Sequence, residues 1–312
     1  MCWWRRYSMS AVLISVVIPA YNYAHVLVRS VESVLTQLDE DVELVVVDDG
    51  STDSTENVVA QIKLSHKKNF NYIKKQNGGP SSARNVGIDN STGRFIVFLD
   101  ADDELMPCAI NTIRDRINKE NDAELIVASH ISVRSNGKQA LHRVSPIPED
   151  SYLKAKLYLL SKKIGMSNGA VFFHRKIFEK YRFNEKFRNS EDVPVFAYAL
   201  ANYRVCVESE PLVKIHKHDD SLRHNAVQAK KTGMDLVEEV FCAGRMPLKV
   251  LGLKKQYAVQ RALSLSRTCF LSQDYFGCIH YYMVALRKSW LVIFRASYTR
   301  KVIKSKMKVL IG

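Results

Sequence analysis

The chain has no clustered cysteines, no phosphate-binding glycine loop and no long hydrophobic run. Its six cysteines form no C-x-x-C pair, which argues against zinc and a disulfide framework and fits a reducing compartment. Neither G-x-x-x-x-G-K-[ST] nor G-x-G-x-x-G follows a predicted strand, so the kinase and dinucleotide-binding classes lose support.

Apolar runs in the sequence are short. None reaches the roughly 18 residues that cross a bilayer. The apolar run at residues 11–18 ends at Pro19 without a signal-peptide cleavage pattern, so we interpret it as a strand. With 46% hydrophobic and 25% charged residues, the chain has an ordinary globular composition. We therefore expect a soluble or peripheral protein.

Acidic residues are scarce in the last fifth of the chain. From Arg245 to Gly312 there are 14 Lys/Arg and one acid, Asp274, a net charge of +13, which leaves only +1 of the total +14 for residues 1–244. Trp290, Phe294 and Tyr298 are expected on one helical stripe, which Lys301 and Lys308 continue, so charge is the stronger argument. The interleaved basic residues favour an anionic membrane surface as partner. A solvated helix is the alternative, and no nucleic-acid-binding motif supports a nucleic acid partner.

Strand and helix patterns alternate in the first half, which predicts an α/β fold with a mostly parallel sheet. The predicted strands are residues 13–18, 42–47, 71–75, 95–99, 125–129 and 169–173. The predicted helices are residues 25–36, one following a capping box at Asp53 and Glu56, one opening at Ser81, and residues 193–201. Residues 136–150 are expected to form a loop. Helices alone are expected from Ala226 onward, with a hairpin at Gln273–Asp274. We expect one domain over residues 1–225 and a basic helical extension over residues 226–312.

Polar turn residues follow three of the predicted strands. Residues 19–22 read Pro-Ala-Tyr-Asn, residues 48–51 read Asp-Asp-Gly-Ser, and residues 100–103 read Asp-Ala-Asp-Asp. Ligands of open α/β sheets collect at the carboxyl ends of strands. The acidic residues at 100–103 suit a hard divalent cation, although a solvated acidic turn is the alternative.

These blocks, together with residues 77–88 (NGGPSSARNVGI), resemble family 2 inverting glycosyltransferases, which have the GT-A fold. The order and spacing of the motifs match over residues 13–105, and the resemblance continues more weakly to about Asn225. It implies a nucleotide-sugar-binding, mostly parallel Rossmann-like sheet. The Gln-x-x-Arg-Trp element of processive polysaccharide synthases is missing, so single transfer is expected rather than polymerisation.

The resemblance places the donor, with a UDP-sugar favoured, on residues of these blocks. Tyr21 would stack on the base, with a half-buried core aromatic as the alternative. Asp49 rather than Asp48 would contact the base. Arg84 would bind a phosphate or a base carbonyl, or pair with a nearby aspartate. The expected donor-binding residues are Pro19, Ala20, Tyr21, Asn22, Asp48, Asp49, Gly78, Arg84, Asp100 and Asp102.

A divalent metal, Mn²⁺ or Mg²⁺, is implied as cofactor of the DXD type. Asp102 is its expected ligand, with Asp100, His216 and His218 as further candidates, while an ordinary polar loop is the alternative for the histidines. In Glu191-Asp192, the family's acid pair, Asp192 would be the catalytic base and Glu191 would shape its surroundings. Helix capping is the alternative for both.

We therefore predict a metal-dependent, inverting hexosyl- or N-acetylhexosaminyltransferase of cell-surface polysaccharide or lipopolysaccharide synthesis. It would transfer one sugar to a glycan or lipid-linked acceptor, acting in the cytoplasm and peripherally on the membrane. A sugar nucleotidyltransferase and a non-catalytic nucleotide-sugar-binding module are the alternatives.

Overall fold

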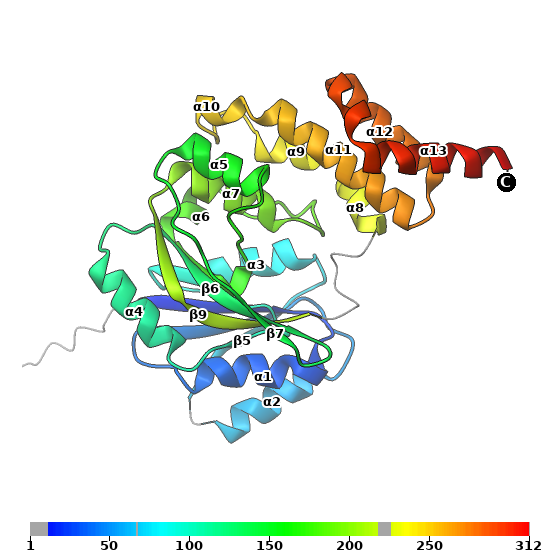
Figure 1. Cartoon of the computed structure of the whole chain (residues 1–312). Coiled ribbons are helices and arrows are strands. Elements are labelled where there is room, and N and C mark those ends of the chain that lie inside the picture. The colour runs from blue at the N-terminus through cyan, green and yellow to red at the C-terminus, as the bar shows by residue number, and fades with distance from the viewer. Residues whose placement is uncertain (1–11, 67, 218–225, 312) are drawn as a thin grey trace, which may run out of the picture. The chain divides into compact units, whose positions relative to one another are not determined.

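The computed structural model describes residues 12–66, 68–217 and 226–311 (Figure 1). They form two compact units. The first unit contains residues 12–144, 166–182 and 205–217, and the second contains residues 145–165, 183–204 and 226–311. Residues 145–165 and 183–204 thus group with the C-terminal helices. The domain boundary expected at residue 225 lies outside the described residues and stays a prediction.

A single mixed sheet forms the centre of the first unit. Its strand order is β3-β2-β1-β4-β8-β6-β9-β5, and β7 pairs with β6. Strand β1 is parallel to β2 and β4, and β2 is parallel to β3, whereas β8 is antiparallel to both β4 and β6. The strands are β1 (Ile14–Ala20), β2 (Val42–Asp48), β3 (Asn71–Lys74), β4 (Phe95–Phe98), β5 (Glu104–Leu105), β6 (Leu125–Arg134), β7 (Gln139–His142), β8 (Val171–His174) and β9 (Val205–Lys217). The predicted parallel α/β arrangement is confirmed in the N-terminal half.

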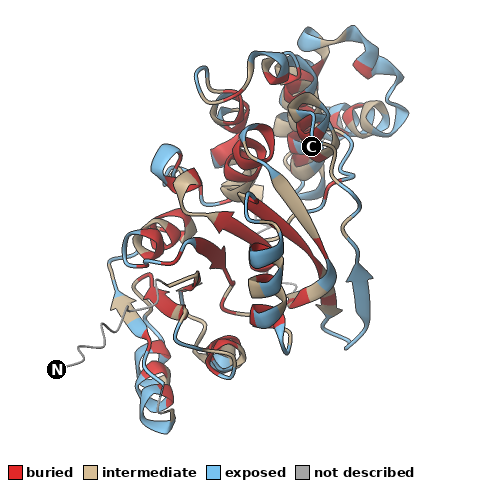
Figure 2. Cartoon of the chain, turned by 90° about the vertical axis from the view of Figure 1, so that its left-hand side faces the viewer, coloured by how far each residue is buried: buried red, intermediate tan, exposed pale blue. Residues whose placement is uncertain are grey.

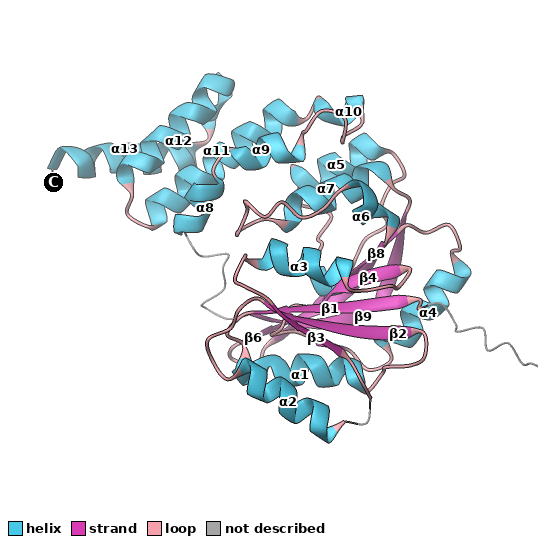
Figure 3. Cartoon of the chain, turned by 180° about the vertical axis from the view of Figure 1, so that it is seen from behind, coloured by secondary structure: helices cyan, strands magenta, loops and turns pink. Residues whose placement is uncertain are grey.

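The central strands are apolar throughout because helices cover both faces of the sheet. Figure 3 shows α3 on one face and α1 and α2 on the other. Every residue of β4 is fully buried, and Figure 2 shows the buried strands in red. A strand covered on both sides has no solvent-facing positions and therefore no alternation of polar residues. The helical elements of this unit are α1 (Ala24–Leu35), α2 (Thr55–Ser65), α3 (Pro80–Asp89), α4 (Ala109–Lys119), η1 (Asn168–Ala170) and α6 (Lys176–Lys180).

Two local expectations for this unit are wrong. The capping box does not form, because Ser54 is the N-cap of α2 and makes no side-chain cap; Asp53 instead accepts hydrogen bonds from the Thr55 backbone and hydroxyl and from the Ala24 N–H. The expected loop at 136–150 contains strand β7, which pairs with β6 through residues 139–142.

The second unit is helical in its described part. Its helices are α5 (Ser151–Leu159), α7 (Asp192–Asn202), α8 (Ala226–Thr232), α9 (Asp235–Val240), α10 (Leu248–Leu251), α11 (Lys254–Leu271), α12 (Tyr275–Lys288), η3 (Trp290–Phe294) and α13 (Ala296–Ile311). The expected hairpin is confirmed: Gln273 has a φ of +61°, and the Asp274 carboxylate caps α12 by accepting the Gly277 N–H at 2.8 Å. No helix within the described ranges is long and apolar enough to cross a membrane.

The aromatic residues of the C-terminal tail do not lie on one helix. Trp290 and Phe294 belong to the 3₁₀ element η3, whereas Tyr298 belongs to α13 and packs, half-buried, against the core of α11 and α12. The single helical stripe expected for these three residues is therefore wrong.

Candidate functional site

The three polar strand ends meet at one edge of the sheet, as predicted. Ala20 at the end of β1 lies beside Asp48 at the end of β2, and Val17 lies beside Phe98 at the end of β4. The Asp49 N–H donates to the Ala20 carbonyl at 2.8 Å, which continues the pairing into the loops. Because all three strands are parallel, the loops that follow them share the side of the sheet where ligands bind.

Asn22 connects the loops after β1 and β2. Its backbone has a φ of +58°, in the left-handed region that asparagine tolerates better than most residues. Its N–H donates to the Ser51 hydroxyl at 2.9 Å, and its side-chain oxygen accepts the Thr52 N–H at 2.8 Å. The adjacent Tyr21 is 44% exposed, so it is not the half-buried core aromatic of the alternative interpretation. Tyr21 therefore directly follows β1 as an exposed residue, while Pro19 and Ala20 lie within β1.

Asp48 and Asp49 are both buried and bonded within the chain. Asp48 accepts the Ser51 N–H and the Tyr72 hydroxyl, at 2.8 and 2.7 Å. Burial raises the pKa of Tyr72, and the Asp48 carboxylate raises it further. The Asp48 side chain thus fixes the loop and strand β3.

Asp49 holds the loop before α3. Its carboxylate accepts the N–H groups of Gly78 and Gly79, at 2.9 and 2.6 Å, and forms an ion pair with Lys75 at 2.7 Å. The neighbouring Gly50 has a φ of +77°, and a Cβ there would lie 2.9 Å from the Asn77 nitrogen. These contacts bring residues 75–79 against the end of β2. The contact of Asp49 with a base stays a prediction.

Replacing Asp49 by asparagine is expected to lower the free energy of unfolding by about 2 kcal/mol, because a buried carboxylate that accepts two N–H bonds loses its charge and one acceptor. Urea denaturation followed by circular dichroism measures this. Glu56→Gln is the matched control: it also breaks an ion pair to a lysine, Lys74 at 2.6 Å, but on the surface, where such pairs contribute little. Equal stability of the two variants would contradict the structural role of Asp49.

Arg84 lies on α3, whose first residue is Pro80, and is 4% exposed. Its guanidinium contacts the Asp100 carboxylate at 3.1 Å. The aspartate pairing considered as an alternative is therefore present, and it fixes Arg84 beside the acidic turn. A guanidinium held in this way can also offer N–H donors to a phosphate or carbonyl oxygen.

Residues 100–103 form a tight turn, in which the Asp103 N–H donates to the Asp100 carbonyl at 2.9 Å. Asp100 and Asp102 are half-exposed, whereas Asp103 is buried and accepts the His216 N–H at 2.8 Å. Asp103 therefore binds β9 and does not cap a helix. Burial raises the pKa of Tyr23 to about 12, and the charges of Asp102, Asp100 and Asp103 add to the rise, so the turn carries a negative field into this region.

Helix α1 holds this turn by its backbone, a feature that the sequence analysis missed. The Arg29 guanidinium donates to the Asp102 carbonyl, and the Ser30 hydroxyl donates to the Asp100 carbonyl at 3.4 Å. The Ser33 hydroxyl accepts the Leu105 N–H at 3.0 Å, one turn farther along. The sequence did carry a signal for this contact, because Ser30 and Ser33 are polar residues on the inner face of the helix predicted over residues 25–36.

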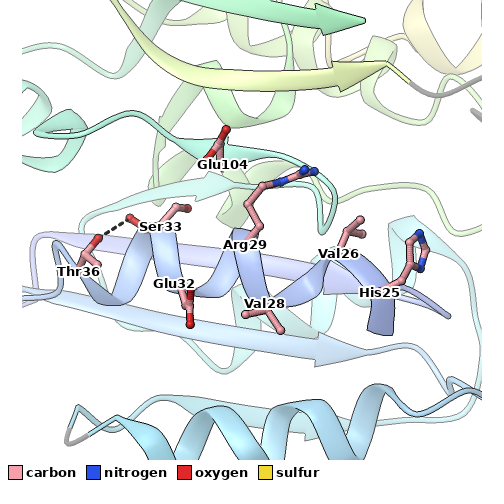
Figure 4. Close-up of a pocket in the computed structure, with 8 residues that line it drawn as sticks. All are labelled: His25, Val26, Val28, Arg29, Glu32, Ser33, Thr36 and Glu104. Atoms are coloured by element: carbon pink, nitrogen blue, oxygen red, sulfur yellow. Dashed lines mark hydrogen bonds between the residues drawn. The ribbon is translucent and has the colours of Figure 1, made fainter. Parts of the chain in front are cut away.

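An open depression of about 480 Å³ lies along α1 (Figure 4). Of the described residues, those that line it come from α1 and β5, including Glu32 and Glu104, and not from the strand-end loops. Figure 4 shows Arg29 extending from α1 toward the segment that carries Glu104. None of the predicted donor-binding residues lines this depression, although its lining residue Arg29 donates to the Asp102 carbonyl.

His216 lies on β9 with its Nε2 3.2 Å from a Glu104 carboxylate oxygen. Together with its N–H bond to Asp103, this places the histidine next to the acidic turn. Within the described ranges, no three His, Cys, Asp or Glu side chains are grouped as a preformed metal site. His218, the other candidate histidine, lies outside the described residues.

The predicted acid pair Glu191-Asp192 lies in the second unit, at the start of α7. Glu191 is the N-cap residue but makes no side-chain cap, and Asp192 is the first residue of the helix. Burial raises the pKa of Tyr158 well above its usual value, with the Asp192 charge as a further cause. Burial also raises the pKa of Tyr257 to about 12, and the Asp192 charge again contributes. The Asp192 charge thus acts on buried phenols of α5 and α11, with burial as the larger cause of both pKa shifts.

The parallel half-sheet with acidic strand ends defines an α/β protein of the GT-A fold class. A sequence model described as Glycosyl transferase family 2 matches residues 15–182, so the chain belongs to glycosyltransferase family 2. The recognition made from the sequence motifs is confirmed.

Named relatives support the same family. The chain is 30% identical over 183 residues to the GalNAc(5)-diNAcBac-PP-undecaprenol beta-1,3-glucosyltransferase of Campylobacter jejuni, covering 57% of each chain. It is also 30% identical over 239 residues to the minor teichoic acid biosynthesis protein GgaA of Bacillus subtilis, covering 73% of this chain and 53% of that one. The chain thus spans little more than half the length of these two relatives.

Solved structures show the same fold. The chain resembles residues 1–349 of TarS from S. aureus with a TM-score of 0.66 and 19% identity, over 94% of this chain and 88% of that one. A second structure of that TarS fragment, in complex with UDP-GlcNAc, has a TM-score of 0.65. At this identity the similarity is evidence for the fold alone.

Proposed function

We propose that this glycosyltransferase moves a single sugar, with inversion, from a UDP-sugar to a hydroxyl of a glycan or lipid-linked acceptor. The observation that carries the proposal is the meeting of the β1, β2 and β4 loops at one sheet edge. The relatives named for teichoic acid synthesis and for an undecaprenol-linked glycan, and the UDP-GlcNAc complex of TarS, support a cell-surface polysaccharide or lipopolysaccharide product.

Donor binding is assigned to the first unit. Tyr21 offers an exposed ring on which a base can stack. Arg84, fixed against Asp100, supplies N–H donors to a phosphate or base oxygen. Gly78 lets the loop pass close to the start of α3, because a Cβ there would lie 2.7 Å from the Ser82 hydroxyl.

A divalent cation fits the acidic turn, since Asp100 and Asp102 are half-exposed and carboxylate oxygens suit such an ion. The negative charge of the turn also contributes to the raised pKa of Tyr23. Asp102 and Asp100 would hold it, with His216 nearby. Such an ion neutralises the charge that develops on a departing diphosphate. The turn's backbone, held by Arg29 and Ser30, keeps both carboxylates in place.

Inversion requires a base to take the proton of the acceptor hydroxyl as its oxygen attacks the anomeric carbon. The bond from that carbon to the diphosphate oxygen breaks, and UDP leaves with the electron pair. Asp192 is assigned as this base, with Glu191 beside it. Asp192 is the first residue of α7, so a regular helix carries the carboxylate.

The test measures transfer from a panel of UDP-hexoses and UDP-N-acetylhexosamines to lipid-linked acceptors, with Mn²⁺ or Mg²⁺ and with EDTA. One donor should be consumed with release of UDP, EDTA should abolish turnover, and added metal should restore it. Thermal shift with each donor identifies the sugar, because a ligand that binds only the folded state raises the melting temperature. Full turnover in EDTA would refute the metal assignment, and pyrophosphate release from UTP and a sugar phosphate would refute transfer.

The place of action belongs to the same proposal. A lipid-linked acceptor is met at a membrane, and the net charge of +13 on residues 245–312 favours an anionic membrane surface. We assign the enzyme to the cytoplasmic face of the membrane, as a peripheral protein. Nucleotide sugars would reach it there from the cytoplasm.

A further inference from the structure

Helix α13 has two faces that carry apolar side chains, and the described residues of the chain cover one of them. Val302 and Ser305 are buried, 6% and 0% exposed, and Val302 belongs to the core formed with α11 and α12. Ile303, Met307 and Leu310 are 53%, 55% and 85% exposed. Their spacing of four and three residues places them on one stripe, which we call the outer stripe.

Cationic side chains flank the outer stripe. Arg300, Lys304, Lys306 and Lys308 are exposed, and at 100° per residue Arg300 and Lys304 fall on one side of the stripe and Lys306 on the other. Residues 275–311 contain eight Lys/Arg and no acid. None of these eight forms an ion pair with a side chain of the described residues, so their charge is available to a partner.

The element just before α13 exposes further apolar side chains. In η3, Trp290 and Phe294 are 66% and 71% exposed, and their rings contact each other at 5.8 Å between centroids. Leu291 and Ile293 are also exposed. Aromatic and aliphatic side chains next to lysines are typical of segments that lie in a membrane interface.

We propose that the outer stripe of α13, with η3, lies in the headgroup region of an anionic lipid bilayer. The stripe enters the boundary with the acyl chains, and Arg300, Lys304 and Lys306 contact the headgroup phosphates. A nucleic acid backbone would use the cations but leave the three apolar side chains in water, which is why a bilayer fits better. This proposal rests on the membrane location given under the proposed function and names the surface that binds the membrane. Its test measures vesicle binding and is independent of sugar transfer.

The test uses the full chain with sedimentable vesicles of phosphatidylcholine, alone or with a third of phosphatidylglycerol. Binding to the anionic vesicles only is expected. Lys304→Gln with Lys306→Gln should weaken that binding about 30-fold, and Met307→Gln with Leu310→Gln at least about 10-fold. Two control variants make the same kinds of change at exposed residues elsewhere: Lys119→Gln removes a charge, and Leu248→Gln replaces an apolar side chain. Both should bind like the unchanged protein.

Three outcomes overturn the proposal. Equal binding to neutral and anionic vesicles would refute the outer stripe as the lipid-binding surface. So would binding as strong as that of the unchanged protein by both pairs of variants. A dimer in analytical ultracentrifugation that Met307→Gln with Leu310→Gln dissociates, without vesicle binding, assigns the stripe to a second copy of the chain. A protein that does not bind vesicles can instead bind single-stranded RNA in a salt-sensitive way, with the same affinity after Met307→Gln and Leu310→Gln. That result would identify nucleic acid as the partner of the cationic side chains. Thermal melting of each variant shows that its fold is intact.

Discussion

An Asp102→Asn enzyme is expected to transfer sugar about 10²–10³-fold more slowly than the unchanged enzyme, the usual effect of losing one group that stabilises developing charge. The neutral amide is a poor ligand for a divalent cation, while the bond from Arg29 to the Asp102 backbone carbonyl does not depend on the carboxylate and should persist. Initial rates measured over a range of Mn²⁺ concentrations should show the loss in kcat, with partial recovery only at high metal.

Asp115→Asn is the matched control, since Asp115 is an exposed aspartate on α4 and the change removes the same charge. Its rate should equal that of the unchanged enzyme. Asp100→Asn is expected to be less selective, because it also removes the partner that holds Arg84 at 3.1 Å. Unreduced turnover by Asp102→Asn, with an unchanged metal dependence, would contradict the assignment of the acidic turn.

The strand-end loops could be predicted because their signals are local. Each is a short apolar run followed by turn residues, and the alternation with helices makes the strands parallel. Parallel neighbours bring their carboxyl ends together without further information. The placement of Tyr21, Asp49 and Asp102 at one edge of the sheet therefore followed from the sequence.

The contacts that fix these residues could not be predicted in the same way. Asp49 meets Gly79 across 30 residues, and Arg29 meets Asp102 across 73 residues. Such pairs depend on how helices pack on the sheet, and no local pattern encodes them. The short strand β5 is another example, since two residues, Glu104 and Leu105, form a strand only because β9 lies beside them.

For the C-terminal tail, the predicted basic and helical character is correct, but the predicted arrangement of its aromatic side chains is wrong. The sequence indicated a basic, aromatic-rich helix, but placed Trp290, Phe294 and Tyr298 on one stripe. Ser289 is extended between α12 and η3, which breaks the helix and changes the phase of everything after it. Together with the 3₁₀ geometry of η3 and the non-helical Arg295, this break lets Tyr298 of α13 pack against the core while Met307 is exposed.

An Asp192→Asn enzyme is expected to lose about 10²–10⁴-fold in the rate of transfer, the usual contribution of a general base. Donor binding should stay unchanged, because the predicted donor contacts lie in the first unit. Single-turnover rates and donor affinity by calorimetry separate the two effects. The competing interpretation is that Asp192 only stabilises the N-terminus of α7, where an acid is favourable in any helix.

Asp235 distinguishes these interpretations. It is an exposed acid in the first turn of α9, in the same unit, so Asp235→Asn removes a comparable helix-terminal charge without touching the proposed base. If capping were the whole role of Asp192, both variants would lose a little stability and neither would lose much activity. Catalysis by Asp192 predicts a large loss of transfer in one variant only, with similar melting temperatures in both.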